Sequence, residues 1–77
     1  MATVGRSTRS PAQLAASRVM DEEFEATVDG REPRFPNRTT IVAADVVTDD
    51  MIRHCHTEGR AVVIVDEHGD VQFLPVP

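Results

Sequence analysis

The chain has 77 residues, a formal net charge of −5, 40% apolar residues and 27% charged residues. These values are typical of one small globular domain and exclude both a two-domain protein and a disordered chain. The only cysteine, Cys55, cannot form an internal disulfide, and no apolar run approaches the roughly 18 residues of a membrane span, so we expect a cytoplasmic protein.

Residues 1–9 are small and polar and show no apolar period, which predicts a flexible basic arm. The arm lacks the apolar segment of a signal peptide. Arg6 and Arg9 of the arm, together with Arg18 further along, are candidate phosphate contacts because arginine pairs with phosphate oxygens. We expect residues 10–77 to form a single domain.

A helix is predicted to begin after Ser10 and to end near Val28. Ser10 and Gln13 have the spacing of a capping box, and Pro11 suits the first helical position. Gly30 supplies the left-handed residue that commonly follows a helix.

The apolar residues of this helix predict which side faces the core. Five of them fall within an arc of about 160°, and we expect this stripe to be buried: Leu14, Ala16, Met20, Phe24 and Val28. Asp21 and Glu25 flank the stripe, and Glu22 is close to them in sequence. We predict that these three acids bind a basic protein partner.

Residues 29–39 are predicted to form a loop that is extended around Pro33 and Pro36. Phe35 lies between the two prolines, and we expect it to anchor the loop or to contact a partner. The segment from Thr40 to Val47 is rich in β-branched and apolar residues, which predicts a strand buried on both faces.

A second helix is predicted between Thr48 and Gly59. Thr48 is a good cap, and Asp49 and Asp50 follow it, where acidic side chains interact favourably with the helix dipole. We expect its core-facing side to consist of Met51, Ile52 and Cys55.

Residues 61–65 and 71–74 are predicted to be strands joined by a turn in which Gly69 adopts a positive φ. Pro75 and Pro77 indicate that the last strand lies at an edge. The predicted fold is therefore a small α+β domain, a helix followed by β-α-β-β with a three-stranded mixed sheet. Because the domain has so few elements, we expect some apolar surface to remain exposed. A protein partner, or a second copy in a homodimer, is expected to cover this surface.

The histidines do not have the spacing of a metal site. His54 and His56 are two residues apart on a predicted helix, so their side chains point to different sides, and His68 lies in the predicted turn. We expect two exposed helix histidines, a buried Cys55 thiol, and no metal or cofactor. The acidic pairs at residues 49–50 and 66–67 are explained by helix capping and turn formation, so we expect no catalytic residues and no enzyme.

The sequence thus favours a non-enzymatic protein-binding module that acts through an acidic helix and an apolar sheet surface. All eight basic residues are arginine, a bias that high-GC coding produces, so we expect a bacterial or phage regulator or inhibitor. One alternative is a nucleic-acid-associated regulator, antitoxin-like or repressor-accessory, that uses the arginine arm. A second alternative is a metal-binding sensor with His54, His56 and His68. No feature predicts membrane binding.

Overall fold

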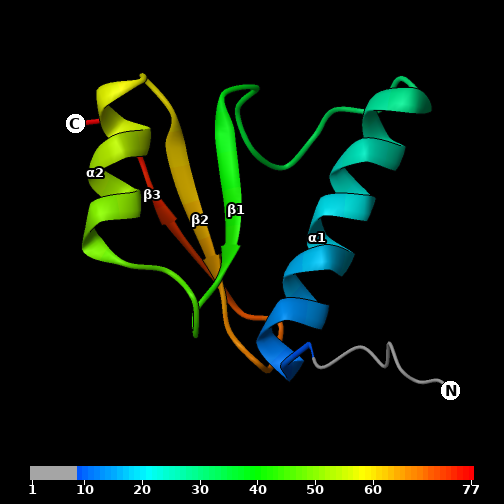
Figure 1. Ribbon diagram of the computed structural model, residues 1–77. Helices are drawn as coiled ribbons and strands as arrows, with labels where there is room; N and C mark the ends of the chain where they lie inside the picture. The colour runs from blue at the N-terminus through cyan, green and yellow to red at the C-terminus, as the bar shows by residue number, and fades with distance from the viewer. Residues whose placement is uncertain (1–8) are drawn as a thin grey trace, which may run out of the picture.

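The computed structural model describes residues 9–77 and confirms the predicted α+β class. The elements follow the expected order: α1 (Pro11–Val28), β1 (Thr39–Ala43), α2 (Asp49–Thr57), β2 (Ala61–Val65) and β3 (Val71–Leu74). The sheet has the order β1-β2-β3, with β1 and β2 parallel and β2 and β3 antiparallel. It lies between the two helices (Figure 1). Residues 1–8 of the expected arm lie outside the described range.

The strand register divides the sheet residues between two faces. Ile41, Val63 and Phe73 are aligned across the three strands, as are Ala43, Val65 and Val71. These residues form the face on which α1 packs. The alternate residues, which include Val62 and Ile64, point to the opposite face. Among residues 9–77, no helix is long and apolar enough to span a membrane.

Both ends of α1 are fixed by local hydrogen bonds. The Ser10 hydroxyl accepts from the Gln13 amide at 3.1 Å, and the Gln13 side chain accepts from the Ser10 amide at 2.9 Å, so the predicted capping box is present. At the other end, Gly30 has φ +75° and the Arg31 amide donates to the Ala26 carbonyl at 2.8 Å. This arrangement satisfies the last carbonyls of the helix.

The buried side of α1 is not the predicted stripe. The helix packs on the sheet through small side chains one helical turn apart: Ala12, Ala15, Ala16, Val19 and Ala26. Of the predicted stripe only Ala16 is buried, whereas Leu14, Met20, Phe24 and Val28 are exposed. The small residues let the helix backbone approach the valine-rich strands closely, and the buried cluster consists of alanines and valines.

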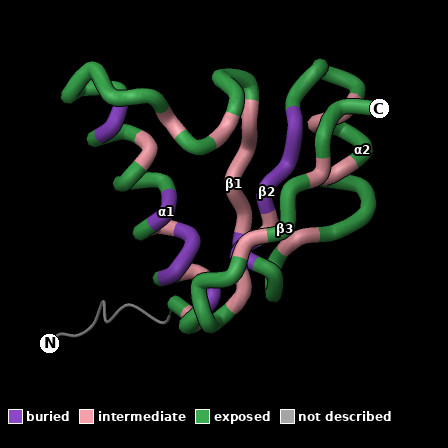
Figure 2. Tube along the Cα trace, turned by 180° about the vertical axis from the view of Figure 1, so that it is seen from behind, coloured by how far each residue is buried: buried purple, intermediate pink, exposed green. Residues whose placement is uncertain are grey.

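The first strand is shorter and more exposed than predicted. It ends at Ala43, because the chain turns there and the Ala43 carbonyl accepts from the amides of Val46 and Val47 at 3.2 Å. β1 lies at the sheet edge, and only Ala43 in it is buried (Figure 2). The prediction of a strand to Val47 buried on both faces was therefore wrong. β3 forms the other edge, as predicted.

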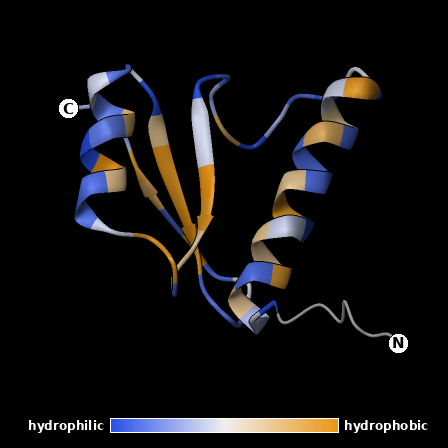
Figure 3. Cartoon of the chain, viewed as in Figure 1, coloured by the Kyte–Doolittle hydropathy of each residue, from blue (hydrophilic) through white to orange (hydrophobic). Residues whose placement is uncertain are grey.

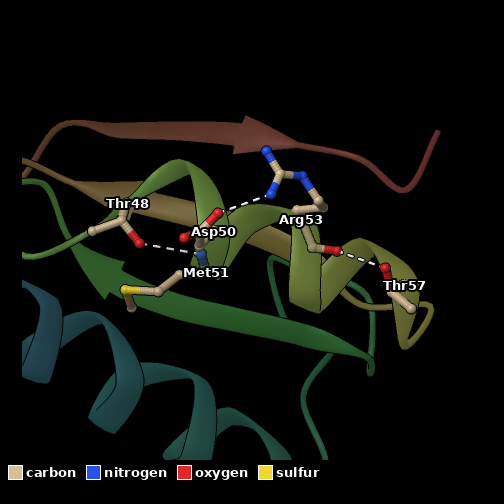
Figure 4. A network of polar contacts seen from close by, with 5 residues as sticks. All are labelled: Thr48, Asp50, Met51, Arg53 and Thr57. Carbon is tan, nitrogen blue, oxygen red and sulfur yellow. Dashed lines mark hydrogen bonds and ion pairs between the residues drawn. The ribbon is translucent and has the colours of Figure 1, made fainter.

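The α2 helix is held by its own caps (Figure 4). The Thr48 hydroxyl accepts from the Met51 amide at 3.2 Å, and Asp50 pairs with Arg53 at 2.8 Å. None of its residues is fully buried: Ile52 and Cys55 are half-buried, and Met51 is exposed. The predicted core side of this helix therefore covers the sheet only in part.

The turn between β2 and β3 has the expected chemistry. One carboxylate oxygen of Asp66 accepts from the amides of His68 at 2.9 Å and of Asp70 at 3.0 Å. The Gly69 amide donates to the Asp66 carbonyl at 3.0 Å, and Gly69 has φ +83°. The acidic residue here is a structural part of the turn.

Candidate functional site

Large apolar side chains remain on the outside of α1. The exposed fractions are 49% for Leu14, 44% for Met20, 69% for Phe24 and 66% for Val28. Apolar segments are spread over α1 and lie along β1 and β2 (Figure 3). Exposed single side chains of this kind are ordinary, but several together on one small domain indicate a surface for a partner.

Met20 belongs to a groove between α1 and β1. The groove has a volume of about 310 Å³, and its walls come from both elements and from the loop after β1. We name it the α1–β1 groove and define it by six of its residues: Ala16, Ser17, Met20, Ile41, Val42 and Val46. Five of these six residues are apolar, although the side chain of Val42, which is aligned with Ile64, points to the opposite face of the sheet. Val46 is 42% exposed, so the groove is open to solvent at the end of the strand.

The strand in this groove, β1, has one edge without a strand partner in the part of the chain that the structure describes. The Ala44 amide donates to the Val65 carbonyl, and the Arg38 carbonyl accepts from the Ala61 amide, both at 2.8 Å. Because the backbone groups of alternate residues point to opposite edges, those of Thr39, Ile41 and Ala43 point away from β2. The groove therefore combines apolar side chains with backbone donors and acceptors that are available to a further strand.

The predicted acidic residues lie on α1, and all three are exposed: Asp21, Glu22 and Glu25. Glu22 and Glu25 border a hollow whose opposite wall includes Arg31 and Arg34 of the following loop. Since the buried side of α1 is its alanine side, Asp21 and Glu25 lie away from the sheet and do not flank the core as expected. They remain accessible to a partner.

Glu23 has a role that its sequence context did not reveal. Its carboxylate accepts from the amides of Arg34 and Phe35, each at 3.1 Å. Position 23 lies on the same side of α1 as the buried alanines, one helical turn before Ala26. This spacing was the sequence signal that Glu23 faces the fold. Glu23 thus ties the loop before β1 to the helix.

Phe35 packs as the anchor of this loop. Its ring stacks on Phe73 of β3 with centroids 6.2 Å apart, and it also contacts the core cluster. The Arg34 guanidinium lies 5.1 Å from the Phe35 ring centroid. Much of the Phe35 side chain is therefore used inside the domain, and the residue is only half-buried.

The structure does not gather the predicted phosphate contacts. Arg6 lies outside the described residues. Arg9 borders the α1–β1 groove and donates to the Ser17 hydroxyl at 3.3 Å. Arg18 borders a different hollow, beside His68 and Gly69 of the β2–β3 turn. Arg9 and Arg18 therefore lie on different sides of α1.

The histidines are also separate. His54 lies 3.3 Å from a Glu58 carboxylate oxygen on the outside of α2. His56 was expected to be exposed but is half-buried, and its Nε2 atom is buried without a hydrogen-bond partner. Cys55 beside it is half-buried rather than fully buried. Among residues 9–77, no three His, Cys, Asp or Glu side chains are grouped as metal ligands.

The structure therefore brings together a set of residues different from the predicted one. The groove joins an exposed methionine of α1 to the edge of β1, whereas the predicted acids lie on the outer side of the helix. No protein-family model, no curated protein and no solved structure shows a significant match to this chain.

Proposed function

We propose that this chain is a non-enzymatic protein-binding module and that the α1–β1 groove is its docking surface. One observation carries the proposal: Met20, Ile41 and Val46 line a groove beside a strand edge that has no strand partner among the described residues. An extended partner segment can pair with such an edge and bury the apolar walls at the same time. Full burial of one exposed side chain of this size contributes about 1.5–3 kcal/mol.

The polar candidates for chemistry have structural roles that support a binding function. Asp49 and Asp50 lie in the first turn of α2, where they interact with the helix dipole. Asp66 accepts backbone hydrogen bonds in the β2–β3 turn. The structural roles of Asp49, Asp50 and Asp66 thus explain these three carboxylates without catalysis.

The acidic side of α1 is a second surface, separate from the α1–β1 groove, that attracts a basic partner. Asp21, Glu22 and Glu25 are exposed, and the chain carries a net charge of −5. Exposed charges of one sign raise the association rate with an oppositely charged partner more than they raise affinity. The role we propose is that of a cytoplasmic bacterial or phage regulator or inhibitor.

A matched pair of substitutions tests the docking surface. Met20→Glu places a charge in the α1–β1 groove, and Leu14→Glu places the same charge on α1 outside it, beside His68 and Gly69. The two residues are similarly exposed, at 44% and 49%. Each of the three proteins is immobilised in turn. We expect the wild type and the Leu14→Glu variant to retain the same partner protein, and the Met20→Glu variant not to retain it.

Equal retention by all three proteins, with circular dichroism showing that each is folded, would contradict the assignment of the groove. A separate double variant, Glu22→Lys with Glu25→Lys, tests the acidic side. We expect it to slow association with a basic partner and to reduce the salt dependence of the rate. An unchanged association rate would contradict the steering role of these acids.

A further inference from the structure

We infer that the partner seated on the α1–β1 groove is a second copy of this chain, joined through antiparallel pairing of β1 with itself about Ile41. This inference rests on the proposed function, since it names the occupant of the same surface. The product is a two-fold symmetric dimer with a continuous six-stranded sheet. Three features of the described residues favour this occupant over an unrelated segment.

The first feature is the self-complementary backbone edge. With the two-fold axis at Ile41, its amide and carbonyl face those of the same residue in the second copy and can form two reciprocal hydrogen bonds. Thr39 then lies opposite Ala43 of the second copy. The Ala43 carbonyl already accepts from Val46 and Val47, but the Ala43 amide also points outward and can donate to the Thr39 carbonyl of the other chain.

The second feature is the charge difference between the two ends of β1. Residues 31–38, before the strand, contain three arginines and one glutamate. Residues 45–50, after the strand, contain three aspartates and no basic residue. Antiparallel pairing places the basic end of one copy beside the acidic end of the other, whereas parallel pairing would bring like charges together. Arg38 and Asp45 are the charged residues nearest to the strand and both are exposed.

The third feature is the contrast between the two edges of the sheet. β3 is followed directly by Pro75 and then by Pro77, and proline discourages pairing with another strand because it has no backbone N–H. β1 has the sequence Thr-Thr-Ile-Val-Ala and, unlike β3, is not directly followed by a proline. Sheet edges in natural proteins are usually protected by such residues, so an unprotected apolar edge indicates a paired one.

The same dimer also covers the part of α1 around Met20. Met20 borders the groove beside Ile41, so the two-fold axis at Ile41 brings the Met20 side chains of both copies towards each other. Ala16 and Ser17 line the same side of the helix, and their small side chains allow the two helices to approach. Phe24 lies one turn beyond Met20 and gains a surface to pack against.

Sedimentation equilibrium over a micromolar to millimolar concentration series tests the inference with the full chain. We expect a reversible dimer for the wild type. Met20→Glu should raise the dissociation constant of the dimer at least about tenfold, because it buries two charges near the two-fold axis. Val42→Lys, which places a lysine on the strand edge, should do the same. Leu14→Glu should leave the dissociation constant unchanged within about twofold, since it lies outside the groove.

A wild-type chain that stays monomeric throughout, or a dimer that Met20→Glu and Val42→Lys leave intact, overturns the inference. The retention experiment separates this failure from failure of the proposed function. If the monomeric chain holds a different protein and loses it in the Met20→Glu variant, the groove is a docking surface with another occupant. If retention is absent or does not depend on Met20, the proposed function falls as well.

Discussion

Loss of the Glu23 carboxylate tests whether this side chain fixes the loop before β1. In Glu23→Ala, the amides of Arg34 and Phe35 both lose their acceptor. A hydrogen bond to a charged group contributes about 1.5–3 kcal/mol when shielded. Here the Arg34 bond is exposed and the Phe35 bond only partly buried. We therefore expect a total loss of about 1.5 kcal/mol, which for a domain of this size lowers Tm by about 6–12 °C.

Thermal and urea unfolding followed by far-ultraviolet circular dichroism measures this loss without aromatic fluorescence, since the chain has neither Trp nor Tyr. Glu22→Ala is the control, because Glu22 is an exposed neighbour on the same helix, and it should cost less than about 0.5 kcal/mol. Glu23→Gln keeps one acceptor oxygen and should fall between the two. Equal stability of the Glu23→Ala and Glu22→Ala variants would refute the role of Glu23.

Three further substitutions probe local features, each measured by the same unfolding experiments. Thr48→Ala removes the cap of α2 and should lower the free energy of unfolding by about 1 kcal/mol. An unchanged free energy of unfolding would show that the cap is dispensable. Gly69→Ala should cost about 1 kcal/mol through its φ of +83° alone, since no neighbour crowds the position; a more stable variant would contradict this. His56→Leu removes a buried nitrogen atom that has no hydrogen-bond partner among the described residues, and it should raise the free energy of unfolding by about 0.5–2 kcal/mol. The exposed control, His54→Leu, should not raise it. Destabilisation by His56→Leu would contradict the reasoning.

Sequence signals that act over a few residues predicted the fold well. The capping residues Ser10 and Thr48 and the glycines after both helices set the element boundaries, because they bond to backbone groups close by in the chain. The two strands at residues 61–65 and 71–74 were predicted with their observed bounds. The turn that ends β1 at Ala43 was missed, because the apolar residues continue to Val47 and hide it.

The candidate surface was harder to predict, because it depends on which side of α1 meets the sheet. The helical arc of the apolar residues selected Leu14, Ala16, Met20, Phe24 and Val28, whereas packing against valine-rich strands favoured the smaller alanine side. The expectation that apolar surface would remain exposed was confirmed. On α1, this exposed apolar surface consists of the residues that were wrongly assigned to the core. Long-range contacts such as Glu23 with the amide of Phe35 left no local signal other than helical spacing.

Amide hydrogen exchange at Ile41, measured by NMR at low and high protein concentration, tests the central claim most directly. The Ile41 amide points away from β2, so it has no strand partner at that edge among residues 9–77 of the same chain. Pairing of β1 with a second copy predicts slow exchange at high concentration and fast exchange on dilution or in the Met20→Glu variant. Fast exchange at every concentration, while the buried amides of β2 remain protected, would contradict the claim.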